Sequence, residues 1–152
     1  MDRRSFIIAA SAAAYAAQAA AQTPAQDGPE LRPIQPENDL ERSFVAALAS
    51  EEQRPAFRRL LLQSQVALAL ASTASDAGPL LRPLDGGGRT GFIFTSATRI
   101  NSVMGPTAPR AMIAGRLALE RLRGNYAVIN LSLSPMLRLE PPDVARLLLM
   151  AS

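Results

Sequence analysis

Polar residues stand at two points where an apolar run of this sequence ends. Thr95 and Ser96 follow the apolar run 91–94 and open a helical pattern, with Arg99 one turn further on. A strand that gives way to a helix start offers free backbone N–H groups. Together with two hydroxyls and a guanidinium they favour a carboxylate or another small anion. The simpler alternative is that Ser96 only caps the helix.

Asn130 ends a second apolar run, 126–129. An amide in that place must find hydrogen-bond partners, because leaving it unpaired costs about 1–3 kcal/mol. Such a residue usually bonds to the loop beside it and fixes a turn, and a ligand contact is the alternative. We therefore predict a ligand site made by Thr95, Ser96, Arg99 and Asn130, with a carboxylate or another small anion as its ligand.

The composition excludes several kinds of catalysis. The chain of 152 residues has no cysteine, histidine, tryptophan or lysine, and all 16 basic residues are arginine. Disulfides, thiolate nucleophiles, Cys/His zinc sites, Ser-His-Asp triads and lysine chemistry are therefore impossible. No carboxylate lies within an apolar run that would raise its pKa. We predict no catalytic residue, metal or cofactor. The acids considered were Glu51, Glu52, Glu120, Glu140 and Asp143.

Two further patterns receive a structural interpretation. The run Asp85-Gly86-Gly87-Gly88-Arg89 is followed by an apolar strand pattern, which favours a hairpin turn over a phosphate loop. The methionines are not clustered as copper ligands would be, so we expect them in the core. They are Met104, Met112, Met136 and Met150.

The net charge gives little support to nucleic-acid binding. Sixteen arginines are offset by 13 acidic residues, the formal charge is +3, and the arginines are dispersed along the chain. The high isoelectric point follows from the pKa of arginine in a chain without lysine or histidine. We expect a protein or a small anionic ligand as partner, and no nucleic acid.

Residues 1–21 have the layout of an export signal. Arg3 and Arg4 precede Phe6 and an alanine-rich apolar stretch, and small residues allow cleavage after Ala19 or Ala21. The paired arginines resemble a twin-arginine signal, although Asp2 is unusual in its place. The stretch is too short and too rich in alanine for a comfortable membrane span. We predict a cleaved signal, hence a periplasmic or secreted bacterial protein without a stable span after cleavage.

The remaining chain divides into a linker and one domain. Residues 22–38 contain four prolines and many polar groups, which predicts a flexible linker. Residues 39–152 alternate helical and strand patterns, which predicts an α/β or α+β domain. We expect a small mixed sheet of about five strands with about five helices packed on it.

Local signals place most of these elements. Asn38 and Glu41 form a capping-box pattern before an amphipathic helix with Leu40, Phe44, Ala47 and Leu48 on its apolar stripe, and Pro55 opens a second helix. Large and small apolar residues alternate over 66–71, predicting a buried strand whose alanine face lets another element approach closely. The later signals predict a hairpin over 80–95 and then a helix over 97–104 that Gly105 ends. They also predict a helix ended by Gly124, a strand over 126–130 and a last helix from Pro141.

The order of these motifs resembles the N-terminal domain of the SseB family. The resemblance rests on Phe94-Thr95-Ser96, on Gly115-Arg116-x-x-Leu119-x-x-Leu122-x-Gly124, and on Leu139-Glu140-Pro141-x-Asp143-Val144-Ala145-x-Leu147-Leu148, and it spans about residues 39–150. Leu131-Ser132-Leu133 replaces the Pro-Gly-Ser turn of the family, and Glu140 replaces a capping serine. The resemblance implies a fold, and no cofactor or catalytic residue.

Three functional hypotheses follow. The first is an exported, non-catalytic binding or interaction module that uses an exposed sheet edge or the helix start near Ser96. The second is a small envelope hydrolase or isomerase that uses carboxylates such as Glu140 or Asp143 with hydroxyls. The third is an envelope structural protein whose N-terminus remains uncleaved as an anchor.

Overall fold

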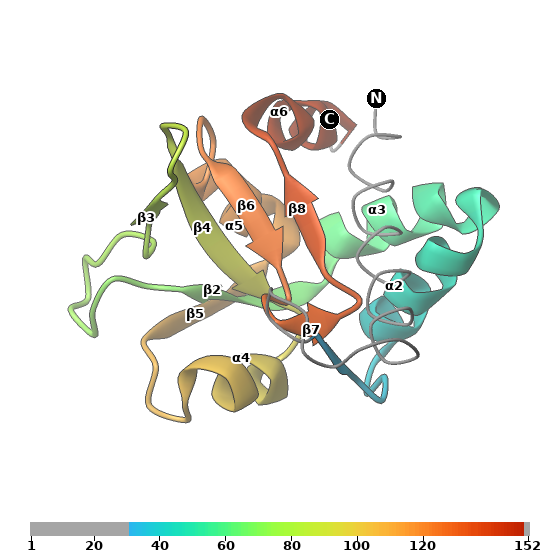
Figure 1. Ribbon diagram of the computed structural model, residues 1–152, viewed down its shortest axis with the longest axis horizontal. Coiled ribbons are helices and arrows are strands. Elements are labelled where there is room, and N and C mark those ends of the chain that lie inside the picture. Colours follow the sequence, from blue (N-terminus) through green and yellow to red (C-terminus); the bar gives the residue numbers. More distant parts are fainter. Residues whose placement is uncertain (1–30, 151–152) are drawn as a thin grey trace.

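The computed structural model describes residues 31–150, which form an α+β fold (Figure 1). The main sheet has six strands in the order β5-β2-β4-β6-β8, with β3 paired to β4, and a small second sheet pairs β1 with β7. Only the β4–β6 pairing of the main sheet is parallel, so the predicted mixed sheet is confirmed. The strands are β1 (Arg32–Pro33), β2 (Gln65–Ala69), β3 (Arg82–Pro83), β4 (Arg89–Phe94), β5 (Arg110–Ala114), β6 (Tyr126–Ile129), β7 (Leu133–Ser134) and β8 (Leu137–Leu139).

Five α-helices and one short 3-10 helix complete the described chain. They are α2 (Asp39–Ala49), η1 (Glu51–Gln53), α3 (Arg54–Gln63), α4 (Ala97–Met104), α5 (Gly115–Arg121) and α6 (Pro141–Met150). The capping signals explain several of their ends. Asn38 caps α2, Ser96 caps α4, and Gly105 ends α4 with a positive φ of 101°. The predicted bounds of α4 are those of the structure.

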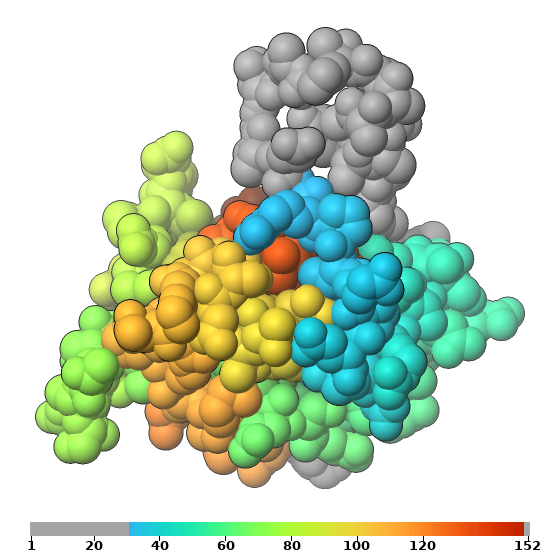
Figure 2. All heavy atoms as spheres, turned by 90° about the horizontal axis from the view of Figure 1, so that it is seen from below, coloured from blue at the N-terminus to red at the C-terminus, as the bar shows by residue number. Residues whose placement is uncertain are grey.

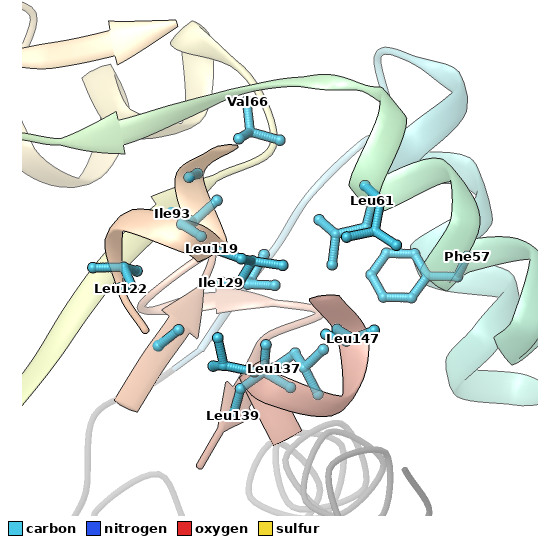
Figure 3. Close-up of a cluster of buried hydrophobic side chains, with 14 of the residues drawn as sticks. Phe57, Leu61, Val66, Ile93, Leu119, Leu122, Ile129, Leu137, Leu139 and Leu147 are labelled. Carbon is cyan, nitrogen blue, oxygen red and sulfur yellow. The ribbon is translucent and has the colours of Figure 1, made fainter. Parts of the chain in front are cut away.

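The larger core lies between one face of the sheet and the helices α2, α3, α5 and α6. Phe44 of α2 stacks on Phe57 of α3, with ring centroids 4.6 Å apart. Both rings are fully buried, and Leu61 joins them from the next turn of α3. Figure 3 shows how Leu119, Ile129 and Leu147 meet in this cluster from three different elements.

The opposite face of the sheet packs against α4. Ala67 and Ala69 of β2 lie on this face, and Ile100 of α4 is fully buried together with Phe94. The small side chains let the helix approach closely, as the alternating pattern of β2 predicts. Helix α4 contacts β2 and β4, so it covers one part of this face, and among residues 31–150 Figure 1 shows no helix over the part formed by β6 and β8.

Residues 31–38 correct the prediction of a flexible linker over 22–38. Strand β1 pairs in parallel with β7, and the Arg32 guanidinium donates to the Ser102 carbonyl of α4. We call residues 31–38 the strap; Figure 2 shows them beside α4. Their prolines prevent helix formation but allow extended pairing. A high proline content therefore did not distinguish a paired segment from a flexible one. The predicted signal, with Arg3, Arg4, Phe6, Ala19 and Ala21, lies outside the described residues.

Besides β1, three strands were absent from the sequence prediction. Strand β5 has the sequence Arg-Ala-Met-Ile-Ala, and β7 and β8 span only two and three residues. Each is too short or too mixed in composition to show a clear period of two, and each forms because a partner strand lies beside it. Within residues 31–150, no helix is long and apolar enough to cross a membrane.

Gly115 allows the closest approach between two elements of the core. It starts α5, and its N–H donates to the Ser64 carbonyl at the end of α3. A Cβ atom at this position would lie 1.8 Å from the Leu61 carbonyl oxygen. Since that oxygen belongs to the backbone, neither element can give way locally.

We predict that Gly115→Ala lowers the free energy of unfolding by about 3 kcal/mol, because overpacking here must separate α3 from α5. Urea denaturation measures the loss. Gly86→Ala is the matched control, since nothing lies within 4 Å of its added carbon and its φ is not positive. Equal stability of the two variants would contradict the proposed close packing.

Candidate functional site

Four of the buried polar residues of the described chain form one network. Glu41 and Asn130 are fully buried, Thr95 is 1% exposed, and Arg99 is 8% exposed. They come from the first turn of α2, the ends of β4 and β6, and the first turn of α4. Three of them belong to the predicted ligand site. Glu41 was predicted only as part of a helix cap.

The network centres on a two-point ion pair. The Arg99 guanidinium donates from Nε to Glu41 Oε2 at 2.9 Å and from Nη2 to Glu41 Oε1 at 2.8 Å. The planar guanidinium matches the two carboxylate oxygens, which makes such a pair both strong and directional. The anion that Arg99 was expected to recruit from solution is therefore supplied by the chain itself.

Thr95 and Asn130 satisfy the remaining side of this pair. The Thr95 hydroxyl donates to Glu41 Oε2 at 2.6 Å and accepts from Asn130 Nδ2 at 3.0 Å. The Thr95 N–H donates to Asn130 Oδ1 at 3.0 Å. Asn130 has a positive φ of 62°, a conformation that asparagine tolerates better than most residues. The amide thus joins the ends of β4 and β6.

The strap closes the network from outside. The Gln35 carbonyl accepts from Arg99 Nη2, and the Glu37 N–H donates to Glu41 Oε1 at 2.8 Å. The Glu37 carboxylate lies 3.8 Å from Arg99 Nη2, and Asn38 Nδ2 donates to the Thr95 carbonyl at 3.3 Å. Glu41 therefore reaches the N–H of residue 37, where a capping box would use that of Asn38.

The surroundings shift the pKa of both charged groups toward the ionised form. Burial alone would raise the pKa of the Glu41 carboxyl. The hydrogen bonds from Arg99, Thr95 and the Glu37 N–H, with the positive charge of Arg99, hold it below the ordinary 4.5. The hydrogen bond to Glu41 raises the pKa of Arg99, and the charges of Glu41 and Glu37 add to this against the effect of burial. The pair stays ionised at neutral pH.

The structure separates the four predicted ligand residues into two groups. Thr95, Arg99 and Asn130 contact one another or Glu41, so each has a structural role. Ser96 instead accepts from the Arg99 N–H as the cap of α4. Direct ligand contact by any of these residues stays a prediction. One feature of the sequence does indicate that Glu41 is buried. Glu41 lies three residues before Phe44, which places its charge on the apolar stripe of α2.

The other candidate carboxylates form local contacts. Asp143 is 3% exposed, accepts from the Glu140 N–H at 3.0 Å, and pairs with Arg146 at 2.6 Å. Asp143 therefore caps the start of α6, because it lies two residues after Pro141, within the first turn of the helix. Glu120 pairs with Arg116 one turn away on α5. Over residues 31–150, no group of three or more acidic side chains is placed to hold a metal ion.

We predict that the protein loses stability as the pH falls through the lowered pKa of Glu41. An acid whose folded pKa lies below its unfolded value stabilises the fold above the unfolded value, near 4.5, and loses that contribution as it takes up a proton. Urea denaturation between pH 7 and pH 3 measures the slope.

The control for this prediction removes both charges at once. Glu41→Leu with Arg99→Met should be less sensitive to acid, because the carboxylate that this network holds ionised is gone. Arg99→Met alone leaves the carboxylate buried without its cation and should cost about 3–5 kcal/mol at pH 7. An acid slope in the double variant as steep as in the natural chain would contradict the role given to Glu41.

Comparisons with known proteins add no family to this geometry. The chain matches no protein-family model, no curated protein and no solved structure. The resemblance to the SseB N-terminal domain therefore stays a prediction based on the order of the sequence motifs.

Proposed function

We propose that this protein is an exported binding module that recognises an acidic segment of a partner protein and has no catalytic role. The observation that carries the proposal is a basic and aromatic surface on the part of the sheet that α4 leaves uncovered. We call this surface, formed by Arg82, Tyr126, Val128 and Arg138 around the buried side chain of Thr90, the open face.

Strand register supports the position of these five side chains. Paired residues of neighbouring strands point to the same side, so Arg82, Thr90 and Tyr126 form one row across β3, β4 and β6. Val128 and Arg138 form the next row across β6 and β8. The arginines stand at opposite ends, about 15 Å apart at three strand spacings.

The electrostatics of the open face favour an anionic partner. Arg82 and Arg138 are exposed, and within residues 31–150 neither forms an ion pair with a carboxylate. The Arg138 guanidinium lies 5.0 Å from the centre of the Tyr126 ring, which holds both side chains in place. Tyrosine and arginine contribute most of the binding energy in many protein interfaces.

The apolar centre of the open face favours a peptide over a nucleic acid. Tyr126 and Val128 are half-buried, and Phe92 beside them is only 7% exposed. Stacking of successive bases needs several accessible rings, and this surface offers one ring that an arginine already covers. An extended peptide with carboxylates four or five residues apart spans the distance between the two arginines.

The internal pairing of Glu41 with Arg99 supports a binding role over a catalytic one. The buried Glu41 carboxylate and Arg99 guanidinium hold each other in their charged forms, so neither is available to transfer a proton near neutral pH. Ser96 and the open edge of the sheet remain as further contact regions. A carboxylate hydrolase or isomerase and an anchored structural protein remain the alternatives.

We predict that the photo-reactive residue p-benzoylphenylalanine at position 126 captures a partner protein in living cells, and that Arg82→Gln with Arg138→Gln abolishes the adduct. Leu149, which is 74% exposed on α6, is the control position for the photo-reactive residue. Arg59→Gln with Arg121→Gln, at exposed positions of α3 and α5, is the charge-matched control. The same adduct from position 149, or an adduct unaffected by loss of both arginines, would contradict the assignment.

Export is tested separately by the fate of the N-terminus. We predict that the mature protein begins at Ala20 or Gln22 in a periplasmic or secreted fraction, and that Arg3→Lys with Arg4→Lys keeps the full-length chain in the cytoplasm. Intact mass and N-terminal sequencing of both fractions make the measurement. Normal processing of the double variant would rule out the twin-arginine route, and a full-length cytoplasmic natural chain would overturn export itself.

A further inference from the structure

Strand β5 lies at one end of the main sheet and, among the described strands, pairs only with β2. Two backbone hydrogen bonds at the ends of the β2–β5 pair show which N–H and C=O groups of β5 point toward β2. The Gly115 N–H donates to the Ser64 carbonyl, and the Leu70 N–H donates to the Pro109 carbonyl. Because antiparallel pairing alternates, the backbone groups of Ala111 and Ile113 also point toward β2.

The backbone groups of Arg110, Met112 and Ala114 therefore point away from the sheet. Their N–H groups stand two residues apart along one edge, the spacing that an added strand requires. Gln65 Nε2 donates a long hydrogen bond of 3.4 Å to the Met112 carbonyl, and an added strand would share or displace this bond. The Ala114 carbonyl belongs to the N-cap position of α5.

This edge lacks the usual features that prevent strand addition. Strand β5 contains no proline or lysine, and its register with β2 is continuous over all five residues without a bulge. Its one charged side chain, Arg110, donates hydrogen bonds to the carbonyls of Gly105, Pro106 and Ala108 in the preceding loop. The edge therefore stays open to pairing with another strand.

Exposed apolar side chains accompany the open edge. Met112 of β5 is 37% exposed and Leu117 at the start of α5 is 43% exposed, and both belong to the few large apolar side chains exposed in the described chain. Met112 was expected in the core; the structure corrects this, because it points to the α4 side at the last strand. Burial of such residues is a gain that an added strand would provide.

We propose that β5 pairs antiparallel with β5 of a second copy of this chain, about a twofold axis at Met112. The outward Met112 N–H and carbonyl then bond to the same groups of the other copy. The Ala114 N–H of each copy donates to the Arg110 carbonyl of the other. The two main sheets become one continuous sheet.

The sequence of β5 suits pairing with itself. Arg110 lies opposite Ala114 and Ala111 lies opposite Ile113, so no like charges oppose each other and each small residue faces a larger one. Met112 faces its own copy on the α4 side. Twofold pairing makes every contact twice, which is the usual arrangement in protein dimers.

Sedimentation of the purified chain over a dilution series tests the proposal. The natural chain should be dimeric at the higher concentrations, and Met112→Pro should be monomeric, because proline removes the outward donor without touching the bonds to β2. Met112→Val keeps the N–H and should remain dimeric. Circular dichroism establishes that each variant is folded. A natural chain that is monomeric throughout, or a dimeric Met112→Pro, overturns the proposal.

Cross-linking gives a second result that does not depend on the proline variant. The chain has no cysteine, so one introduced thiol labels one position. A short bismaleimide should join two copies of Met112→Cys. It should leave Leu149→Cys monomeric, although Leu149 is more exposed. Cross-linking at position 149 alone would place the interface elsewhere and overturn pairing through β5.

Discussion

The fold depends on one buried ion pair that five separate segments need in order to satisfy their polar groups. Arg99 and Glu41 neutralise each other, but the desolvation of two charges is repaid only when their remaining hydrogen-bonding positions are filled. Thr95, Asn130 and the strap fill them. The pair therefore makes the positions of α2, α4, β4, β6 and residues 31–38 interdependent, and a loss at any of them exposes a charge.

Beyond this pair, the division of the sheet into two unlike faces explains where recognition can occur. The face against α2, α3, α5 and α6 is completely used by the core. The other face is covered by one short helix, because the alanines of β2 let α4 approach only there. The remaining strands keep arginine and tyrosine at their surface, and the sheet ends in an unprotected strand. One face of the sheet is thus filled by the core, and the other carries the surface to which we assign binding.

Local signals predicted the elements that have marked ends. Ser96 and Gly105 delimit α4, and the alternation in β2 predicts both its burial and the approach of a helix. Strands β5 and β8 were missed because their residues become strands only when a partner lies beside them. Three of the four proposed ligand residues, Thr95, Arg99 and Asn130, do come together. The carboxylate that Thr95 and Arg99 bind was not predicted, because it belongs to Glu41, which lies 58 residues before Arg99 in the sequence. No spacing rule reveals a partner chosen by tertiary structure.

The pairing of β1 with β7 has a consequence for the order of folding. Arg32 lies beside Leu133, so the first described segment is fastened to one near the end of the chain. Closing so long a loop costs entropy that is recovered only when the final contacts form. During synthesis the strap has no binding place until β6 and the turn after it have left the ribosome. Glu41 and Arg99 consequently remain open to water until almost the whole domain has been made.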